Sequence, residues 1–335
     1  MRSFLSGATL AALPKEDGDL RPIAVGEVLR RLVDKRCAEN VKEDMREILE
    51  PWQVGVGTPG GCEAVVHAVR HWFLSYHRRL DRVLARIDFS NAFNTVDRQE
   101  ILASTRELAP SLVPWVDWTY GASSHFTLDT QYLSSQRGVQ QGDPLGPLLF
   151  SLALHRAFAR VRLRAPSECL GVLDISVFYL DDGVLAGKSQ AVSWACRELK
   201  AELEATGLSF IMNKCSVTPS AGADTLVNRE LFPGWQWNLS KNMKFLGAAI
   251  GDETFCEELL AKRQEKATAL LQKLGELGDT QCGYLLLRTC SSYAKLMYSI
   301  RTTPASSQRV GLRNFDAAVL VAFSNFSQLY PGSSA

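Results

Sequence analysis

The stretch "VFYLDDGVLAG" at residues 177–187 places two adjacent aspartates, Asp181 and Asp182, in an otherwise apolar run. Successive side chains of a strand point to opposite faces, so a single strand would turn one of the two toward the core. Burying a carboxylate is costly unless a cation or a metal ion balances its charge. Asp-Asp-Gly is also favourable turn chemistry between two strands. The pair is therefore either a tight turn or part of a charged site.

A third aspartate, Asp88, ends another strand-like run in "LARIDFSNAFNTVD". If the two runs are neighbouring strands, two or three carboxylates converge on one edge of a sheet. Like charges that close cannot all stay ionised without a cation, and carboxylate oxygens suit Mg²⁺. Two such ions can bind both the attacking and the leaving oxygen of a phosphoryl transfer. The residues thus indicate a magnesium site, although aspartates also end strands in many proteins without one.

The hydrophobic spacing predicts the elements that must position these aspartates. We expect strands at 81–89, 174–180 and 183–187 and a strand or hairpin at 244–251. We expect helices at 26–49, 62–79, 97–108, 146–163 and 189–206, and an almost wholly helical segment after residue 252. Asp97 and Glu100 form a capping-box pattern at the start of the third helix. Without regular β-α-β alternation, the order predicts an α+β fold with a small antiparallel sheet.

Composition and charge set broad limits on the function. Hydrophobic residues are 46% of the chain and charged residues 22%, as in a folded globular protein. Lys and Arg number 37 against 36 Asp and Glu, so no overall charge indicates a polyanionic partner. The eight cysteines never form C-x-x-C, which favours reduced thiols over a zinc site. No apolar run approaches the roughly 18 residues of a membrane span. We therefore expect an intracellular protein that has no membrane partner.

Two other patterns are weaker. His67 and His71 have the spacing of a metal pair on a helix, but no third ligand stands nearby, and we interpret them as surface residues. The run at 70–86 interleaves aromatic residues with arginines. It fits either contact with a phosphate backbone or an amphipathic helix with extended arginines.

Six segments, in order over roughly residues 14–250, resemble the motifs of reverse transcriptases, especially those of non-LTR retrotransposons and group II introns. They are "PKEDGDLRPIAV", "DFSNAFNTVDR", "RGVQQGDPLGPLLF", "YLDD" at 179–182, "GLSFIMNKCSV" and "FLG" at 245–247. The resemblance implies a right-hand polymerase fold. It places the fingers at 1–82, the palm at 83–250 with about 109–136 contributing to the fingers, and a helical thumb at 251–335.

The same resemblance implies an RNA-directed DNA polymerase that extends a DNA or RNA primer with dNTPs on an RNA template. Two Mg²⁺ ions, with Mn²⁺ as an alternative, would be held by Asp88, Asp181 and the backbone carbonyl of Phe89. Asp182 would lie beside the metal site, or act only as a turn residue. No segment resembles an endonuclease or an RNase H domain, so we expect a part of a longer retroelement polyprotein.

For the nucleotide, the resemblance implies contacts from Lys15 and Arg21 to the triphosphate and from Gln141 and Gly142 to the base pair. Phe93 would underlie the sugar and exclude a 2′-hydroxyl, unless it is simply a core phenylalanine. This position argues against an RNA-synthesising polymerase.

Two further assignments come from the last motifs. Lys214 matches the proposed proton donor to pyrophosphate, although Ile211 stands where many relatives carry Asn, and a solvated loop lysine is the alternative. Phe245, Leu246 and Gly247 match the primer grip. A competing hypothesis is a catalytically inactive or domesticated nucleic-acid-binding relic.

Overall fold

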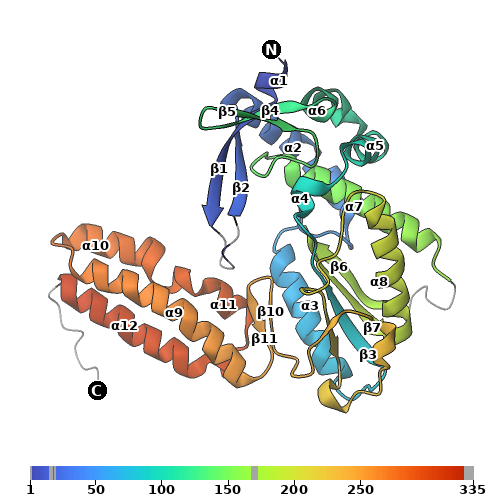
Figure 1. Cartoon of the computed structure of the whole chain (residues 1–335). Coiled ribbons are helices and arrows are strands. Elements are labelled where there is room, and N and C mark those ends of the chain that lie inside the picture. Colours follow the sequence, from blue (N-terminus) through green and yellow to red (C-terminus); the bar gives the residue numbers. More distant parts are fainter. Residues whose placement is uncertain (1, 15–17, 19, 167–172, 328–335) are drawn as a thin grey trace. The chain divides into compact units, whose positions relative to one another are not determined.

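The computed structural model describes residues 2–14, 18, 20–166 and 173–327. The chain forms two compact units. The first contains Met1–Val65 and Ser75–Asn238, and the second contains Val66–Leu74 and Leu239–Ala335. Figure 1 labels their helices and strands.

A five-stranded sheet lies at the centre of the first unit, in the order β6 (Leu173–Tyr179), β7 (Asp182–Lys188), β3 (Arg82–Ile87), β8 (Ser216–Pro219), β9 (Gln236–Trp237). The first four strands pair antiparallel and β9 joins β8 in parallel. The central strands β3 and β7 are largely buried, as their Val, Leu and Ala content requires.

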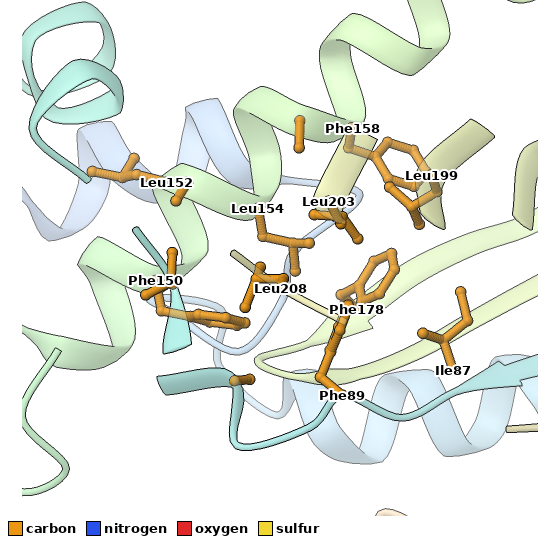
Figure 2. Packing of buried hydrophobic residues seen from close by; sticks show 14 of the residues in the cluster. Ile87, Phe89, Phe150, Leu152, Leu154, Phe158, Phe178, Leu199, Leu203 and Leu208 are labelled. Atoms are coloured by element: carbon orange, nitrogen blue, oxygen red, sulfur yellow. The ribbon is translucent and has the colours of Figure 1, made fainter. Parts of the chain in front are cut away.

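Two long helices cover this sheet, α7 (Gly146–Leu163) and α8 (Ser189–Glu204). Helix α8 packs on β3 and β7, and α7 packs on α8 and on α5 (Arg98–Leu108). Because α7 has neighbours on several sides, most of its side chains are buried. Figure 2 shows part of the resulting core, including Ile87, Phe89, Phe150, Leu152, Leu154, Phe158, Phe178, Leu199, Leu203 and Leu208. Full burial of one such side chain is worth about 1.5–3 kcal/mol.

A four-stranded sheet forms the other end of the first unit, in the order β2 (Leu20–Gly26), β1 (Ala8–Pro14), β4 (Ser124–Leu128), β5 (Gln131–Ser135). Strand β1 pairs antiparallel with β2 and parallel with β4. The helices α1 (Arg2–Leu5), α2 (Val28–Leu49), α4 (Ala92–Thr95) and α6 (Val113–Tyr120) also belong to this unit.

Among its described residues, which end at 327, the second unit is helical apart from the hairpin of β10 (Met243–Phe245) and β11 (Ala248–Ile250). Its main helices are α9 (Glu253–Gly275), α10 (Thr280–Leu286), α11 (Met297–Thr302) and α12 (Arg309–Ser327). Leu260, Leu271, Leu274, Leu287, Leu296, Phe315 and Phe326 form its core. Helix α3 (Gly61–Tyr76) also contributes its residues Val66–Leu74.

The predicted α+β class is confirmed, with antiparallel sheets and a helical C-terminal region. The division into fingers, palm and thumb stays a prediction. The capping box is only half formed. Asp97 accepts a hydrogen bond from the Gln99 amide at 2.7 Å, but Glu100 pairs with Arg156 at 2.7 Å instead of reaching back. None of the helices in the described ranges is long and apolar enough to cross a membrane.

Candidate active site

The two adjacent aspartates lie on the tight hairpin between β6 and β7. Tyr179 pairs with Asp182 across the hairpin, so Leu180 and Asp181 form its two-residue loop. Leu180 has a φ of 56°, a left-handed conformation that costs a residue with a side chain about 1–2 kcal/mol. The turn and the charged site are therefore the same structure, with Asp181 at the tip and Asp182 opening β7.

Asp88 follows β3 directly, next to that hairpin. The last residue pair of β3 and β7 joins Ile87 to Gly183, so one further step along both strands sets Asp88 beside Asp182. Burial raises the pKa of Asp181, and the charge of Asp88 raises it further, against the opposing effect of Arg21. Burial and the neighbouring Asp181 raise the pKa of Asp182 to about 6, with Asp88 adding to the effect. Three carboxylates thus repel one another at one end of the sheet.

This all-oxygen donor set fits a hard divalent cation. Carboxylates whose pKa is raised by burial and mutual repulsion are stabilised in their charged form when a cation binds between them. Within residues 2–14, 18, 20–166 and 173–327, no group of three or more His, Cys, Asp or Glu side chains is placed so that it could hold a metal ion as it stands. This applies to the three aspartates, and also to His67 and His71, which are exposed on α3.

The backbone after β3 adds a further oxygen. Ile211 donates to the Asp88 carbonyl at 2.9 Å and Ser90 donates to the Ser209 carbonyl at 2.9 Å, forming the bridge between Phe89 and Phe210. In such a pair the central residue's own carbonyl points away from the bridging strand. The Phe89 carbonyl is therefore directed to the β7 side, where Asp181 and Asp182 lie.

The two hairpin aspartates have different cationic neighbours. Arg86 lies 3.9 Å from the Asp182 carboxylate. Arg21, exposed on β2, is the cation whose charge lowers the pKa of Asp181. Sequence reasoning missed Arg86, although its position two residues before Asp88 in a strand puts both on one face.

Phe93 lies in the short helix α4 and is half-buried. Its ring packs against Phe150 with centroids 4.8 Å apart. Its carbonyl accepts a hydrogen bond from Val139 at 2.7 Å. Gly138 has a φ of 66°, and a Cβ there would lie 2.4 Å from the Phe93 oxygen. The helix carrying Phe93 is thus closely joined to the segment that leads into Gln141.

Gln141 and Gly142 are joined in turn to the strand carrying Arg21. The Gln141 carbonyl accepts a hydrogen bond from Ala24 of β2 at 2.8 Å. Gly142 has a φ of 129°, and a Cβ there would lie 2.5 Å from the Ala24 oxygen. Only glycine accommodates both this positive φ and this close approach to the Ala24 carbonyl. Main-chain contacts therefore link the segments of Arg21, Phe93 and Gln141.

A buried network around Arg30 supports this region, and sequence reasoning missed it. Arg30 is 3% exposed. It donates to Asp143 at 2.8 Å, to Gln140 Oε1 at 2.7 Å and to the Ser6 carbonyl at 2.8 Å. Asp143 also accepts from the Leu145 amide at 2.8 Å, as expected at a helix start. The available signal was the spacing of Arg30 and Asp34, four residues apart on a helix.

Lys214 lies in an exposed turn, and its amide donates to the Ile211 carbonyl at 2.8 Å. The Ile211 amide donates in turn to the main-chain carbonyl of Asp88, so hydrogen bonds through Ile211 connect this turn to the backbone of Asp88. Lys15 lies outside the described residues.

The hairpin matching the primer grip lies in the second unit. Phe245 is 1% exposed and packs as a core residue, while Leu246 and Gly247 have φ values of 46° and 80° at the tip. The Tyr298 hydroxyl donates to the Leu246 carbonyl at 2.7 Å, and Arg263 donates to the Gly247 carbonyl. Side chains from α11 and α9 therefore hold both tip carbonyls.

Comparisons with known protein sequences agree on one family. The sequence model described as "Reverse transcriptase (RNA-dependent DNA polymerase)" matches residues 13–250. The retrotransposable element SLACS 132 kDa protein of Trypanosoma brucei gambiense is 28% identical over 235 residues, covering 67% of this chain and 19% of that protein. The Pol polyprotein of the type-2 retrotransposable element R2DM of Drosophila melanogaster is 26% identical over 216 residues, covering 60% and 20%. The chain spans about a fifth of the length of these relatives, at 19% and 20%.

Comparisons with solved structures concern the fold alone. Telomerase from Candida albicans, solved in complex with a fragment of telomeric RNA, matches with a TM-score of 0.53 at 11% identity. The match covers 97% of this chain and 61% of that one. Apo telomerase from Candida tropicalis gives the same TM-score and identity, covering 97% and 60%.

Proposed function

Because this chain belongs to the reverse transcriptase (RNA-dependent DNA polymerase) family, we propose that it copies an RNA template into DNA by extending the 3′-hydroxyl of a DNA or RNA primer with dNTPs. The observation that carries the proposal is the convergence of Asp88, Asp181 and Asp182 at one end of the central sheet, where β3 ends beside the β6–β7 hairpin. The retrotransposon relatives support a role for the whole protein in a retroelement.

In this proposal, Asp88, Asp181 and the Phe89 carbonyl hold two Mg²⁺ ions, or Mn²⁺ in their place. Bound there, the ions neutralise the phosphate charge and activate the primer hydroxyl. Asp182 lies beside them and keeps its contact with Arg86. The chain's own contribution is to hold these oxygens in place, so that the reaction proceeds by positioning and charge neutralisation.

The nucleotide binds against the joined segments of the first unit. Arg21, with Lys15, binds triphosphate oxygens, a role for which a guanidinium is suited because it offers several donors in one plane. The Phe93 ring underlies the sugar and excludes a 2′-hydroxyl. Gln141 and Gly142 lie against the new base pair, where glycine allows close backbone approach.

The remaining assignments complete the polymerase. Lys214 donates a proton to the leaving pyrophosphate. Residues 1–82 act as fingers, 83–250 as palm with about 109–136 added to the fingers, and 251–335 as thumb. The tip at Phe245, Leu246 and Gly247 holds the primer end.

The test is dTTP incorporation on poly(rA)/oligo(dT) with Mg²⁺. We expect incorporation by the intact chain and a loss of at least about 10³-fold in Asp181→Asn, since charge stabilisation of this kind is worth that much. Asp174→Asn is the matched control, because Asp174 lies on β6 at the other end of the same hairpin and pairs with an arginine of β3, Arg82. It should retain activity.

Two outcomes would contradict the proposal. Equal activity of Asp181→Asn and the intact chain would refute the site. A folded chain that binds the duplex without incorporating dTTP would instead support the inactive relic.

A further inference from the structure

The tip of the aspartate hairpin is held by a side chain from outside the hairpin. Gln53 is 2% exposed. Its Oε1 accepts a hydrogen bond from the Leu180 amide at 2.8 Å, and its Nε2 donates to the Leu180 carbonyl at 3.0 Å. One amide group thus satisfies both backbone polar groups of the single residue that precedes Asp181.

The segment around Gln53 is itself fixed to the hairpin. Phe178 of β6 donates to the Trp52 carbonyl at 2.6 Å, and its carbonyl accepts from Val54 at 2.9 Å. This parallel bridge sets Gln53 beside the outer edge of β6. The Gly55 amide donates to Gln53 Oε1 at 3.0 Å, which fixes the orientation of the side chain.

Close packing leaves this arrangement little freedom. A Cβ at Gly55 would lie 2.6 Å from the Leu180 nitrogen and 2.9 Å from Gln53 Oε1. A Cβ at Gly183, on the other side of the aspartates, would lie 2.1 Å from the Phe178 ring. The backbone at Gly55 therefore packs closely on the tip of the hairpin, and the backbone at Gly183 packs closely on Phe178 within the hairpin.

We propose that Gln53 is a positioning residue for catalysis, which holds Leu180 in its left-handed conformation and thereby sets the direction of the Asp181 carboxylate. The two-residue turn already favours a positive φ at Leu180. Without the two hydrogen bonds, the turn alone holds this strained conformation, so Leu180 departs from it more often. That departure rotates the next residue, Asp181, and a small misplacement of a catalytic group has a large kinetic effect. The inference rests on the proposed polymerase function for its kinetic consequence only.

The first test is hydrogen exchange followed by mass spectrometry in Gln53→Met, which keeps the length of the side chain and removes both hydrogen bonds. Exchange in the peptide covering 177–183 should become about 10-fold faster. Gln308→Met is the matched control, because Gln308 is 1% exposed and its side chain also makes two hydrogen bonds to the backbone, donating to the carbonyls of Ser299 at 3.1 Å and Thr303 at 2.8 Å. It should lower the melting temperature without changing exchange at 177–183.

The second test is kinetic. Gln53→Met should lower kcat for dTTP incorporation about 10- to 100-fold, with KM for dTTP within about 2-fold. Leu180→Gly should recover part of this loss in the double variant, because glycine adopts a positive φ without strain. A residue that only stabilises the fold would not be rescued in this way.

A second route to the same hairpin leaves Gln53 in place. Gly55→Ala should reproduce the faster exchange and the lower kcat, whereas Gly278→Ala should not, because a Cβ at Gly278 meets no atom within 4 Å. Unchanged exchange at 177–183 in both Gln53→Met and Gly55→Ala would overturn the inference. An inactive intact chain would refute the polymerase proposal, while the exchange experiment would still decide the role of Gln53.

Discussion

The ring of Phe93 offers a direct test of sugar selection at the scale of one residue. Phe93→Ala removes a ring that packs on Phe150 and should open space for a 2′-hydroxyl. We expect the ratio of UTP to dTTP incorporation on poly(rA)/oligo(dT) to rise at least about 10-fold, since a steric block of this size is worth more than one order of magnitude. Comparable use of UTP by the intact chain would contradict the assignment.

A matched control separates this effect from lost packing. Phe323→Ala removes another half-buried ring, which packs on Phe326 with centroids 5.6 Å apart in the second unit. It should leave the ratio unchanged.

Asp34 makes a second prediction at this scale, on pH dependence. Burial raises its pKa to about 7, and the charge of Asp143 adds to the effect against Trp115 and Arg30. The ordinary pKa is about 3.9, so the folded state binds this proton more tightly than the unfolded state. Protonation of Asp34 therefore stabilises the folded state relative to the unfolded state. This contribution to the free energy of unfolding is complete below about pH 4, is lost as the pH rises through about 7, and amounts to at most about 4 kcal/mol.

Asp34→Asn should remove this pH dependence. The asparagine oxygen can still accept the hydrogen bond from Trp115, which is 2.6 Å from the carboxylate. The difference in free energy of unfolding between the intact chain and the variant, from urea titrations at pH 4.5 to 7.5, should change steadily with pH. Asp44→Asn, an exposed position on the same helix, should give a constant difference. A constant difference for Asp34→Asn would contradict the assigned shift.

At the scale of elements, the β10–β11 hairpin depends on helices that follow it. Tyr298→Phe removes the hydrogen bond to the Leu246 carbonyl, which is worth about 1 kcal/mol. If this tip holds the primer, KM for poly(rA)/oligo(dT) should rise several-fold with KM for dTTP unchanged. Tyr284→Phe, at an exposed tyrosine of α10, should change neither value. An unchanged KM for the primer–template in Tyr298→Phe would argue against this use of the hairpin.

Elements were predictable where their signals were local. The apolar spacing located α2, α7 and α8 to within a few residues. The sheet formed by β1, β2, β4 and β5 was not predicted, because β1 pairs with residues more than a hundred positions later. Alternating residues alone do not indicate such a distant partner.

At the scale of the whole molecule, the two carboxylate segments could be brought together from the sequence because each ends an apolar strand and the motifs around them occur in a known order. The Gln53 contact and the distant partners of Arg30 could not be predicted, although the spacing of Arg30 and Asp34 is a local signal. Both join side chains to partners more than a hundred residues away, such as Leu180 and Asp143, and neither glutamine nor arginine signals its partner. The assignment of Val66–Leu74 to the second unit was likewise hidden, because α3 reads as one continuous helix.

The two hydrogen bonds from Gln53 to Leu180 both involve main-chain atoms of Leu180, and this has a consequence for how the hairpin can evolve. Hydrogen bonds to the backbone do not select the side chain, so we expect position 180 to tolerate other residues that are not branched at Cβ. Position 53 has no such freedom, because few side chains carry a donor and an acceptor at that length. Among relatives, we therefore expect the residue at the tip to vary and the distant glutamine to be retained, both as results of the same pair of hydrogen bonds.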